Sequence, residues 1–87
     1  MASYRPVLYQ SQLSSHCARV RRTLRSLGVE VEVRDVLLSR RNREDLRRIA
    51  GDVRVPCLVV CGTAVQGPEE ICKYLHLRYG EGSRERS

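Results

Sequence analysis

The stretch Val53-Arg-Val-Pro-Cys-Leu-Val-Val-Cys61, followed by Gly62-Thr-Ala-Val-Gln-Gly-Pro-Glu-Glu70, decides the fold. Its first part is rich in β-branched residues and is broken by Pro56, which predicts a strand after an extended segment. Gly62-Thr63 can reverse the chain into residues 64–66, so we expect a hairpin. Proline and carboxylates in a first helical turn then predict a helix that begins near Pro68 and runs to about Tyr79.

The residues before this hairpin predict a strand, a helix and a second strand. Residues 5–9 are β-prone, and residues 10–15 are polar. From Cys17 onward apolar residues recur at helical spacing until Gly28, which predicts an amphipathic helix. Alternation over residues 29–36 predicts a strand with one buried and one exposed face.

A second helix is expected between residue 42 and the hairpin. Residues 37–41 are predicted to form a loop, with Asn42 as the cap of a helix that ends at Ala50-Gly51. The resulting order is β-α-β-α-β-β-α. Since a βαβ unit implies parallel pairing and a hairpin implies antiparallel pairing, this order predicts an α/β fold with a mixed sheet and helices on its faces.

The composition indicates one small basic domain. The chain has 87 residues, of which 41% are hydrophobic and 30% are charged. We expect one domain at residues 1–79 and a flexible tail at residues 80–87. No apolar run is long enough to cross a bilayer, and the N-terminus lacks a secretory-type stretch, so a cytoplasmic protein without membrane contact is expected. The formal charge of +6 favours anionic partners.

The cysteines are expected to be free thiols. The absence of a leader sequence and the intervals between the four cysteines argue against a disulfide framework. Only His16 and His76 could join them as nitrogen ligands, so no metal is expected. Cys57 and Cys61 stand in an apolar run and are predicted to be buried as small hydrophobes.

Several short motifs, in this order and spacing, resemble one fold family. They are Leu8-Tyr9, Ser14-Ser-His-Cys17, Leu27-Gly28-Val29, Asp35-Val36, Val55-Pro56, Gly67-Pro-Glu-Glu-Ile71 and Tyr74-Leu75. Together they resemble the thioredoxin-like fold, in its glutaredoxin and glutathione S-transferase N-terminal-domain branch, over residues 5–79. The resemblance implies a four-stranded mixed sheet flanked by three helices, with a cis peptide bond at Val55–Pro56.

The resemblance also implies a site for glutathione at the start of the first helix. Glutaredoxins have their nucleophilic cysteine where this chain has Ser14, and a hydroxyl does not attack disulfides at neutral pH. In transferase-type domains a serine at this place donates a hydrogen bond to the glutathione thiolate. If the domain is a catalyst, Cys17 would be the attacking thiolate, with Ser14 and His16 as its hydrogen-bonding neighbours. Helix capping by Ser14 or Ser15, and packing of Cys17, are the structural alternatives.

The remaining contacts with glutathione are implied in the same way. The backbone of Val55, beside Pro56, would pair with the cysteinyl unit like an added strand. One arginine, Arg40, Arg43 or Arg54, would pair with the glycyl carboxylate. The start of the third helix, with Gly67, Glu69 and Glu70, would meet the γ-glutamyl end of the peptide, and Ser15 is a further glutathione-binding candidate beside Ser14. Pro68 has no amide hydrogen, so one anion donor present in other members is missing here.

The functional prediction is a glutaredoxin-like domain that binds glutathione or glutathionylated proteins in thiol-disulfide metabolism. Its chemistry would be monothiol at most. The alternative is a non-catalytic thioredoxin-fold module for binding or dimerisation. Nucleic acid is not favoured as a partner, because four tyrosines without tryptophan or phenylalanine give no stacking platform. The sequence does not indicate an oligomeric state.

Overall fold

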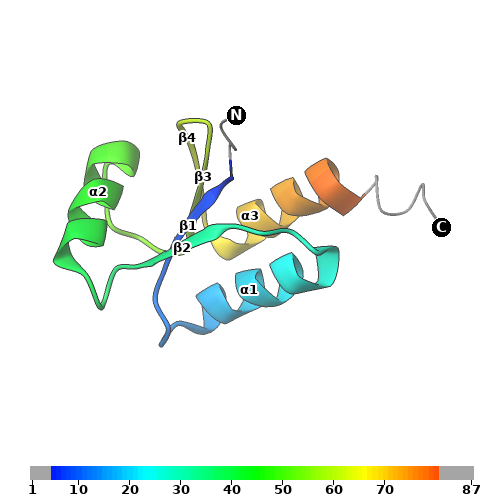
Figure 1. The fold of residues 1–87 in the computed structure, drawn as a ribbon, viewed down its shortest axis with the longest axis horizontal. Helices are drawn as coiled ribbons and strands as arrows, with labels where there is room; N and C mark the ends of the chain where they lie inside the picture. Colours follow the sequence, from blue (N-terminus) through cyan, green and yellow to red (C-terminus); the bar gives the residue numbers. More distant parts are fainter. Residues whose placement is uncertain (1–4, 81–87) are drawn as a thin grey trace.

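The computed structural model describes residues 5–80. The elements are β1 (Val7–Gln10), α1 (Ser15–Leu27), β2 (Glu32–Asp35), α2 (Arg40–Ala50), β3 (Cys57–Val60), β4 (Thr63–Gln66) and α3 (Pro68–Leu75), followed by the π-helical turn η1 (His76–Gly80) (Figure 1). The predicted order β-α-β-α-β-β-α is confirmed. Gly80 belongs to the last helical turn rather than to the predicted tail, and residues 81–87 lie outside the described residues.

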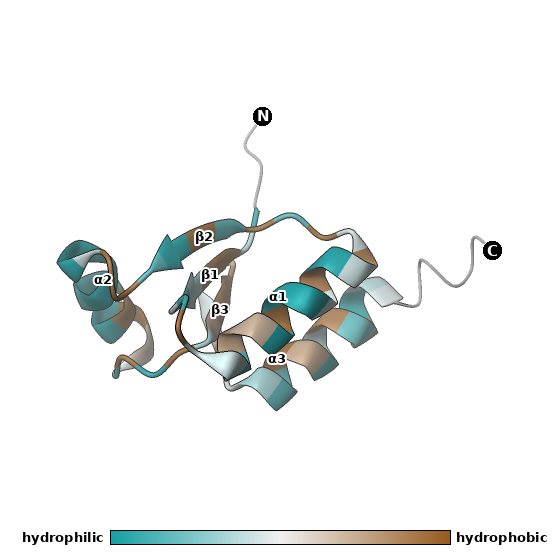
Figure 2. Ribbon diagram, turned by 90° about the horizontal axis from the view of Figure 1, so that it is seen from below, coloured by the Kyte–Doolittle hydropathy of each residue, from teal (hydrophilic) through white to brown (hydrophobic). Residues whose placement is uncertain are grey.

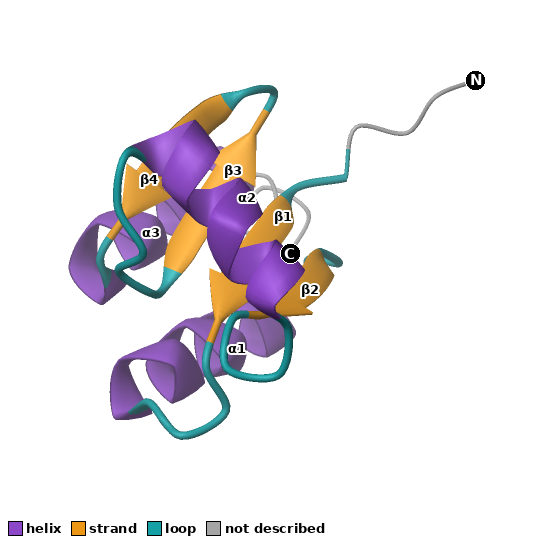
Figure 3. Ribbon diagram, turned by 90° about the vertical axis from the view of Figure 1, so that its left-hand side faces the viewer, coloured by secondary structure: helices purple, strands orange, loops and turns teal. Residues whose placement is uncertain are grey.

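The sheet has the strand order β2-β1-β3-β4. The strands β1 and β2 are parallel, whereas β3 is antiparallel to both of its neighbours, β1 and β4. This arrangement is the predicted mixed sheet. Helices α1 and α3 lie side by side on one face, and α2 lies apart from them beyond the opposite face (Figures 2 and 3).

Two hydrophobic clusters form the core, one on each face of the sheet. Leu8 and Leu58 belong to the cluster under α1 and α3, whereas the adjacent Tyr9 and Cys57 belong to the cluster under α2. Successive side chains of a strand point to opposite faces, so one strand supplies both clusters. The α2 cluster is anchored by Leu46, which is fully buried.

The strand β2 is shorter than the predicted strand of residues 29–36. The amide of Val29 donates to the carbonyl of Leu24 at 3.0 Å and completes the cap of α1 at Gly28, so it is not available to a sheet. Pairing begins only at Glu32, whose amide bonds to Pro6. Val33 is 51% exposed, because β2 is an edge strand and α1 does not cover it fully.

The helix α2 begins three residues earlier than predicted. Ser39, not Asn42, is the cap, and its hydroxyl accepts the amide of Asn42 at 3.1 Å. The Asn42 side chain instead donates to the carbonyl of Asp35 at 3.1 Å and ties the helix to the end of β2. Serine and asparagine are both good caps, so the pattern alone did not separate them.

The hairpin turn lies at Cys61-Gly62, one residue before the predicted reversal. Val60 pairs with Thr63, and both loop residues have positive φ, 49° for Cys61 and 83° for Gly62. This is the geometry of a two-residue turn that follows the strand twist. Cys61 is therefore exposed, and the prediction that it is buried was wrong, whereas Cys57 is buried as predicted. Among residues 5–80, no helix has the length and apolar character needed to span a membrane.

Candidate functional site

Three segments that bear predicted site residues meet at one end of the sheet. Gln66 pairs with Cys57, Cys57 with Tyr9, and Tyr9 with Arg34. The chain thus leaves β1 and β4, and enters β3, at the same end. This topology gathers the start of α1, the Val55–Pro56 peptide and the start of α3. The amide of Gly67 donates to the carbonyl of Pro56 at 3.1 Å and joins the last two segments.

A pocket of about 260 Å³ lies between these two joined segments. It is lined by Arg54, Val55, Pro56, Gln66, Gly67 and Pro68. Four of these were predicted site residues, whereas Glu69 and Glu70 are exposed on the first turn of α3 and do not line it. The Val55–Pro56 peptide bond is cis, as predicted. Within residues 5–80 the backbone of Val55 makes no hydrogen bond, so its amide and carbonyl are available to a ligand.

Asp52 organises the rim of this pocket. Its carboxylate accepts hydrogen bonds from the side chain of Gln66 at 2.8 Å and from the Arg54 amide at 3.1 Å. The Arg54 guanidinium donates to the same carboxylate at 3.3 Å through Nε and Nη2. The hydrogen bond from Gln66, followed by that from the Arg54 amide, lowers the pKa of Asp52 below its ordinary value.

Asp52 and Gln66 were missed by the sequence reasoning. The pattern Asp52-Val-Arg54 is a local signal, because an Asp side chain often bonds to the backbone amide two residues later. The contact with Gln66 spans fourteen residues and depends on the fold. Of the candidate arginines only Arg54 lines the pocket. Arg40 and Arg43 lie in α2, where the side chain of Arg43 donates to the carbonyl of Val36 at 3.4 Å.

Ser14 is the cap of α1. Its backbone is extended, with φ −92° and ψ 127°, and its Oγ accepts the amide of Cys17 at 3.3 Å. A hydroxyl has two lone pairs and one proton, so a capping serine still has its O–H to donate. Ser15 and His16 follow on the first turn of α1 and are exposed to solvent.

Cys17 is fully buried in this same turn. Its sulfur accepts the amide of Ser11 at 3.3 Å, and its side chain lies on the buried stripe with Val20 and Leu24. An attack by Cys17 on a disulfide would therefore require this turn to open. Cys57, next to Pro56, is also buried, and desolvation, helped by the charge of Asp52, raises the pKa of its thiol to about 11. Neither buried thiol is placed for exchange with a ligand.

No group of three or more His, Cys, Asp or Glu side chains within residues 5–80 is arranged to hold a metal ion. The site offers the backbone of Val55, the guanidinium of Arg54, the side chains of Asp52 and Gln66, and the hydroxyl of Ser14 at the start of α1. Such groups suit a small peptide with carboxylates and a thiol, because each can pair with one polar group of that ligand.

Comparison with known proteins gives a consistent result. Residues 8–83 match the family described as glutathione S-transferase, N-terminal domain. A glutathione transferase homolog from Drosophila mojavensis with bound glutathione has a TM-score of 0.76 and 24% identity, over 87% of this chain and 36% of its own. A glutathione S-transferase from Sinorhizobium meliloti has a TM-score of 0.75 and 26% identity, over 94% and 36% of the two chains.

A third solved structure is similar over most of its own length. A mutant of a thioredoxin-like protein has a TM-score of 0.68 and 24% identity, over 72% of this chain and 85% of its own. By contrast, the chain spans about a third of the length of the two transferase chains, which it covers to 36%. No curated protein matches the chain by sequence.

Proposed function

This chain belongs to the family of glutathione S-transferase N-terminal domains, which have a thioredoxin-like fold, and from that membership we propose that it binds glutathione. The ligand is free glutathione or the glutathione moiety of a glutathionylated protein, in the thiol-disulfide metabolism of the cytoplasm. The observation that carries the proposal is the unpaired backbone of Val55 beside the cis-proline pocket.

The cysteinyl unit of glutathione pairs with the Val55 backbone. An extended peptide can add to a free backbone edge through its own amide and carbonyl, and no particular side chain is needed. The peptide then lies across the 260 Å³ pocket between Arg54 and the start of α3. Its two ends reach hydrogen-bond donors, an arginine on one side and free helical amides on the other.

The two carboxylates of the ligand are recognised at these ends. Arg54 pairs with the glycyl carboxylate, because Asp52 engages Nε and Nη2 of the guanidinium and leaves Nη1 to donate. The γ-glutamyl carboxylate meets the first amides of α3, with the Glu69 or Glu70 side chain near its amino group. Pro68 provides no amide there, so binding rests on fewer donors than in members with serine at this place.

Ser14 stabilises the thiolate of the bound peptide. Its Oγ proton remains free while a lone pair caps the helix, so it can donate to a sulfur anion. The burial of Cys17 supports a chemistry in which the ligand contributes the reactive thiol, which makes the domain monothiol at most.

The alternative function is a non-catalytic binding or dimerisation module on the same scaffold. The serine at the nucleophile position, the buried Cys17 and the missing amide at Pro68 favour it. A coupled assay with a glutathione mixed disulfide separates the two functions. Turnover by the unchanged chain supports the catalyst, whereas turnover only after Ser14→Cys supports a scaffold that has kept the site without its nucleophile.

An amide-resolved NMR titration with reduced glutathione tests the binding proposal. We expect shifts of the amide signals within residues 13–18, 54–56 and 67–70, except at Pro56 and Pro68, which have no amide hydrogen. Arg54→Gln should weaken glutathione binding about tenfold, since a charge-assisted pair is removed, whereas Arg41→Gln on the exposed face of α2 should not. γ-Glutamylcysteine amide, which has no carboxylate at this end, should bind the unchanged chain and the Arg54→Gln variant equally. Unchanged spectra, or shifts elsewhere, would refute the proposal.

A further inference from the structure

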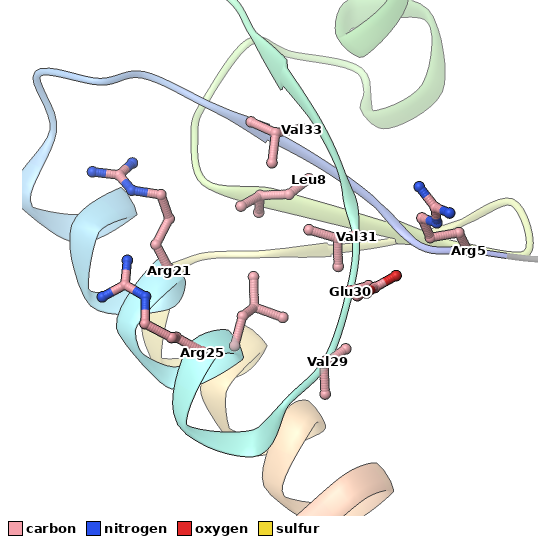
Figure 4. Close-up of a pocket in the computed structure, with 9 residues that line it drawn as sticks. Arg5, Leu8, Arg21, Arg25, Val29, Glu30, Val31 and Val33 are labelled. Atoms are coloured by element: carbon pink, nitrogen blue, oxygen red, sulfur yellow. The ribbon is translucent and has the colours of Figure 1, made fainter.

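A second cavity lies away from the cis-proline pocket, between α1 and the edge strand β2 (Figure 4). It is a groove of about 390 Å³, larger than the pocket beside Pro56, and the two share no lining residue. The groove is wide and open to solvent. The groove exists because β2 is short and at the edge, so that α1 leaves part of the sheet uncovered.

The floor of the groove is apolar. Leu8 from β1, Val31 and Val33 line it from the sheet side, and Leu24 lines it from α1. In Figure 4 the side chains of Leu8, Val31 and Val33 lie between the arginines of α1 and Arg5. Val33 is 51% exposed in spite of its apolar character. A ligand with a hydrocarbon part would remove this surface from water.

The rim of the groove is cationic. Arg21 and Arg25 are separated by one helical turn and lie on the same side of α1, and Arg5 lies beyond β2. The side chain of Gln10 accepts a hydrogen bond from Nη1 of Arg21, which holds this guanidinium in place. The lining contains three arginines and one carboxylate, that of Glu30, so the groove favours an anion.

These two properties define one class of ligand. A simple anion would pair with the arginines but leave the apolar floor exposed to water. An uncharged hydrocarbon would cover the floor but leave the arginines without a partner. Nucleic acid bases are not favoured, because none of the nine lining residues is aromatic. We propose that the groove binds a single-chain carboxylate amphiphile, such as a medium-chain fatty acid. Its carboxylate lies between Arg21 and Arg25, and its chain lies over Val31 and Val33, with the buried Leu8 beneath them.

Calorimetric titration with decanoate, below its micelle concentration, tests this proposal. We expect one molecule to bind, with affinity rising by up to about fourfold per methylene from octanoate to decanoate, as the chain covers more of the floor. Decanol, which has the chain without the charge, and inorganic phosphate, which has the charge without the chain, should each bind at least about tenfold more weakly.

Matched variants assign the binding to the groove. Arg25→Gln should weaken decanoate binding about tenfold, whereas Arg22→Gln, an exposed arginine of α1 outside the groove, should leave it unchanged. Val33→Trp should abolish binding by filling the groove from an exposed position, with little effect on the melting temperature. Equal affinities of the Arg22→Gln and Arg25→Gln variants, or no binding of decanoate at all, would overturn the proposal.

The same variants separate this proposal from the glutathione site. Arg25→Gln and Val33→Trp should leave the glutathione titration unchanged, because neither residue lines the cis-proline pocket. Binding to vesicles of anionic lipid without saturable binding of decanoate would mean that the arginines serve a membrane surface, and would also overturn the proposal.

Discussion

Ser14 combines the observed role of helix cap with the proposed role of hydrogen-bond donor to a ligand in one hydroxyl group. Its oxygen accepts the Cys17 amide, and its proton is left for a ligand. The two roles use different parts of the group, so they can be separated by experiment. Asp52 also has two partners, because its carboxylate accepts hydrogen bonds from both Arg54 and Gln66 at the rim of the pocket.

Replacement of Ser14 by alanine should affect both stability and ligand chemistry. Loss of the cap should lower the free energy of unfolding by about 1 kcal/mol. Loss of the donated hydrogen bond should leave about tenfold less thiolate in bound glutathione at neutral pH, as measured by ultraviolet absorbance. Ser26→Ala, on the exposed last turn of α1, is the matched control. A less stable variant with an unchanged thiolate fraction would reduce Ser14 to a cap.

Asp52 should make stability depend on pH in the acidic range. Its pKa is lowered in the folded state, chiefly by the hydrogen bond from Gln66, so folding favours the ionised form. This contribution is complete above the unfolded-state pKa of about 3.9 and is lost as pH falls through the lower folded-state pKa. The stability difference between the unchanged chain and Asp52→Asn should therefore be constant near neutrality and shrink in acid. Urea unfolding at a series of pH values measures it; a constant difference down to about pH 2 would contradict this account.

At the scale of the element, α2 has an unfavourable charge distribution at its start. Its first turn contains no acidic residue, and arginines occupy Arg40, Arg41 and Arg43 near the positive end of the helix dipole. Its last turn has Arg47 and Arg48, where cations are favourable. The helix therefore owes its position to the Ser39 cap and to the burial of Leu46 rather than to its charges.

Charge reversal at the two ends of α2 should have opposite effects. Arg40→Glu should raise the free energy of unfolding by about 0.5 kcal/mol, and Arg47→Glu should lower it by a similar amount. Both residues are exposed, and both substitutions change the net charge equally, so each is the control for the other. Equal effects in denaturant unfolding would show that overall charge, not position in the helix, decides the outcome.

An element could be predicted from the sequence where the contacts that define it join residues close together in the sequence. Gly28 and Gly51 were correctly assigned as helix ends, because the left-handed backbone that they adopt is a local property. The cap of α2 and the turn at Cys61-Gly62 each had two plausible local solutions, and the fold chose between them. The contact between Asp52 and Gln66 had no local signal, since it exists only when β4 is paired with β3.

At the scale of the whole molecule, the two faces of the sheet are unequal. The face under α1 and α3 contains most of the fully buried apolar side chains, whereas the only residue of α2 that is buried is Leu46. Small domains have a narrow margin of stability, so the weaker face should be the first to open.

Leu46→Ala should therefore be a severe substitution. Loss of the buried side chain should lower the free energy of unfolding by about 2–4 kcal/mol, a large part of the total for a domain of this size. Ile49→Ala, on the same helix but 43% exposed, should change it by less than about 0.5 kcal/mol. Urea unfolding gives both values, and hydrogen exchange should show early loss of protection in α2. Similar losses of unfolding free energy in the Leu46→Ala and Ile49→Ala variants would mean that Leu46 does not anchor the helix.

The exposed Cys61 has a practical consequence for future experiments. The other three cysteines of the chain are buried, and the β3–β4 turn lies at the end of the sheet opposite to Val55 and Ser14. A maleimide dye or spin label should therefore attach at this one position without engineering. Such a tag would report on tumbling and association of the domain while leaving its ligand entrance open.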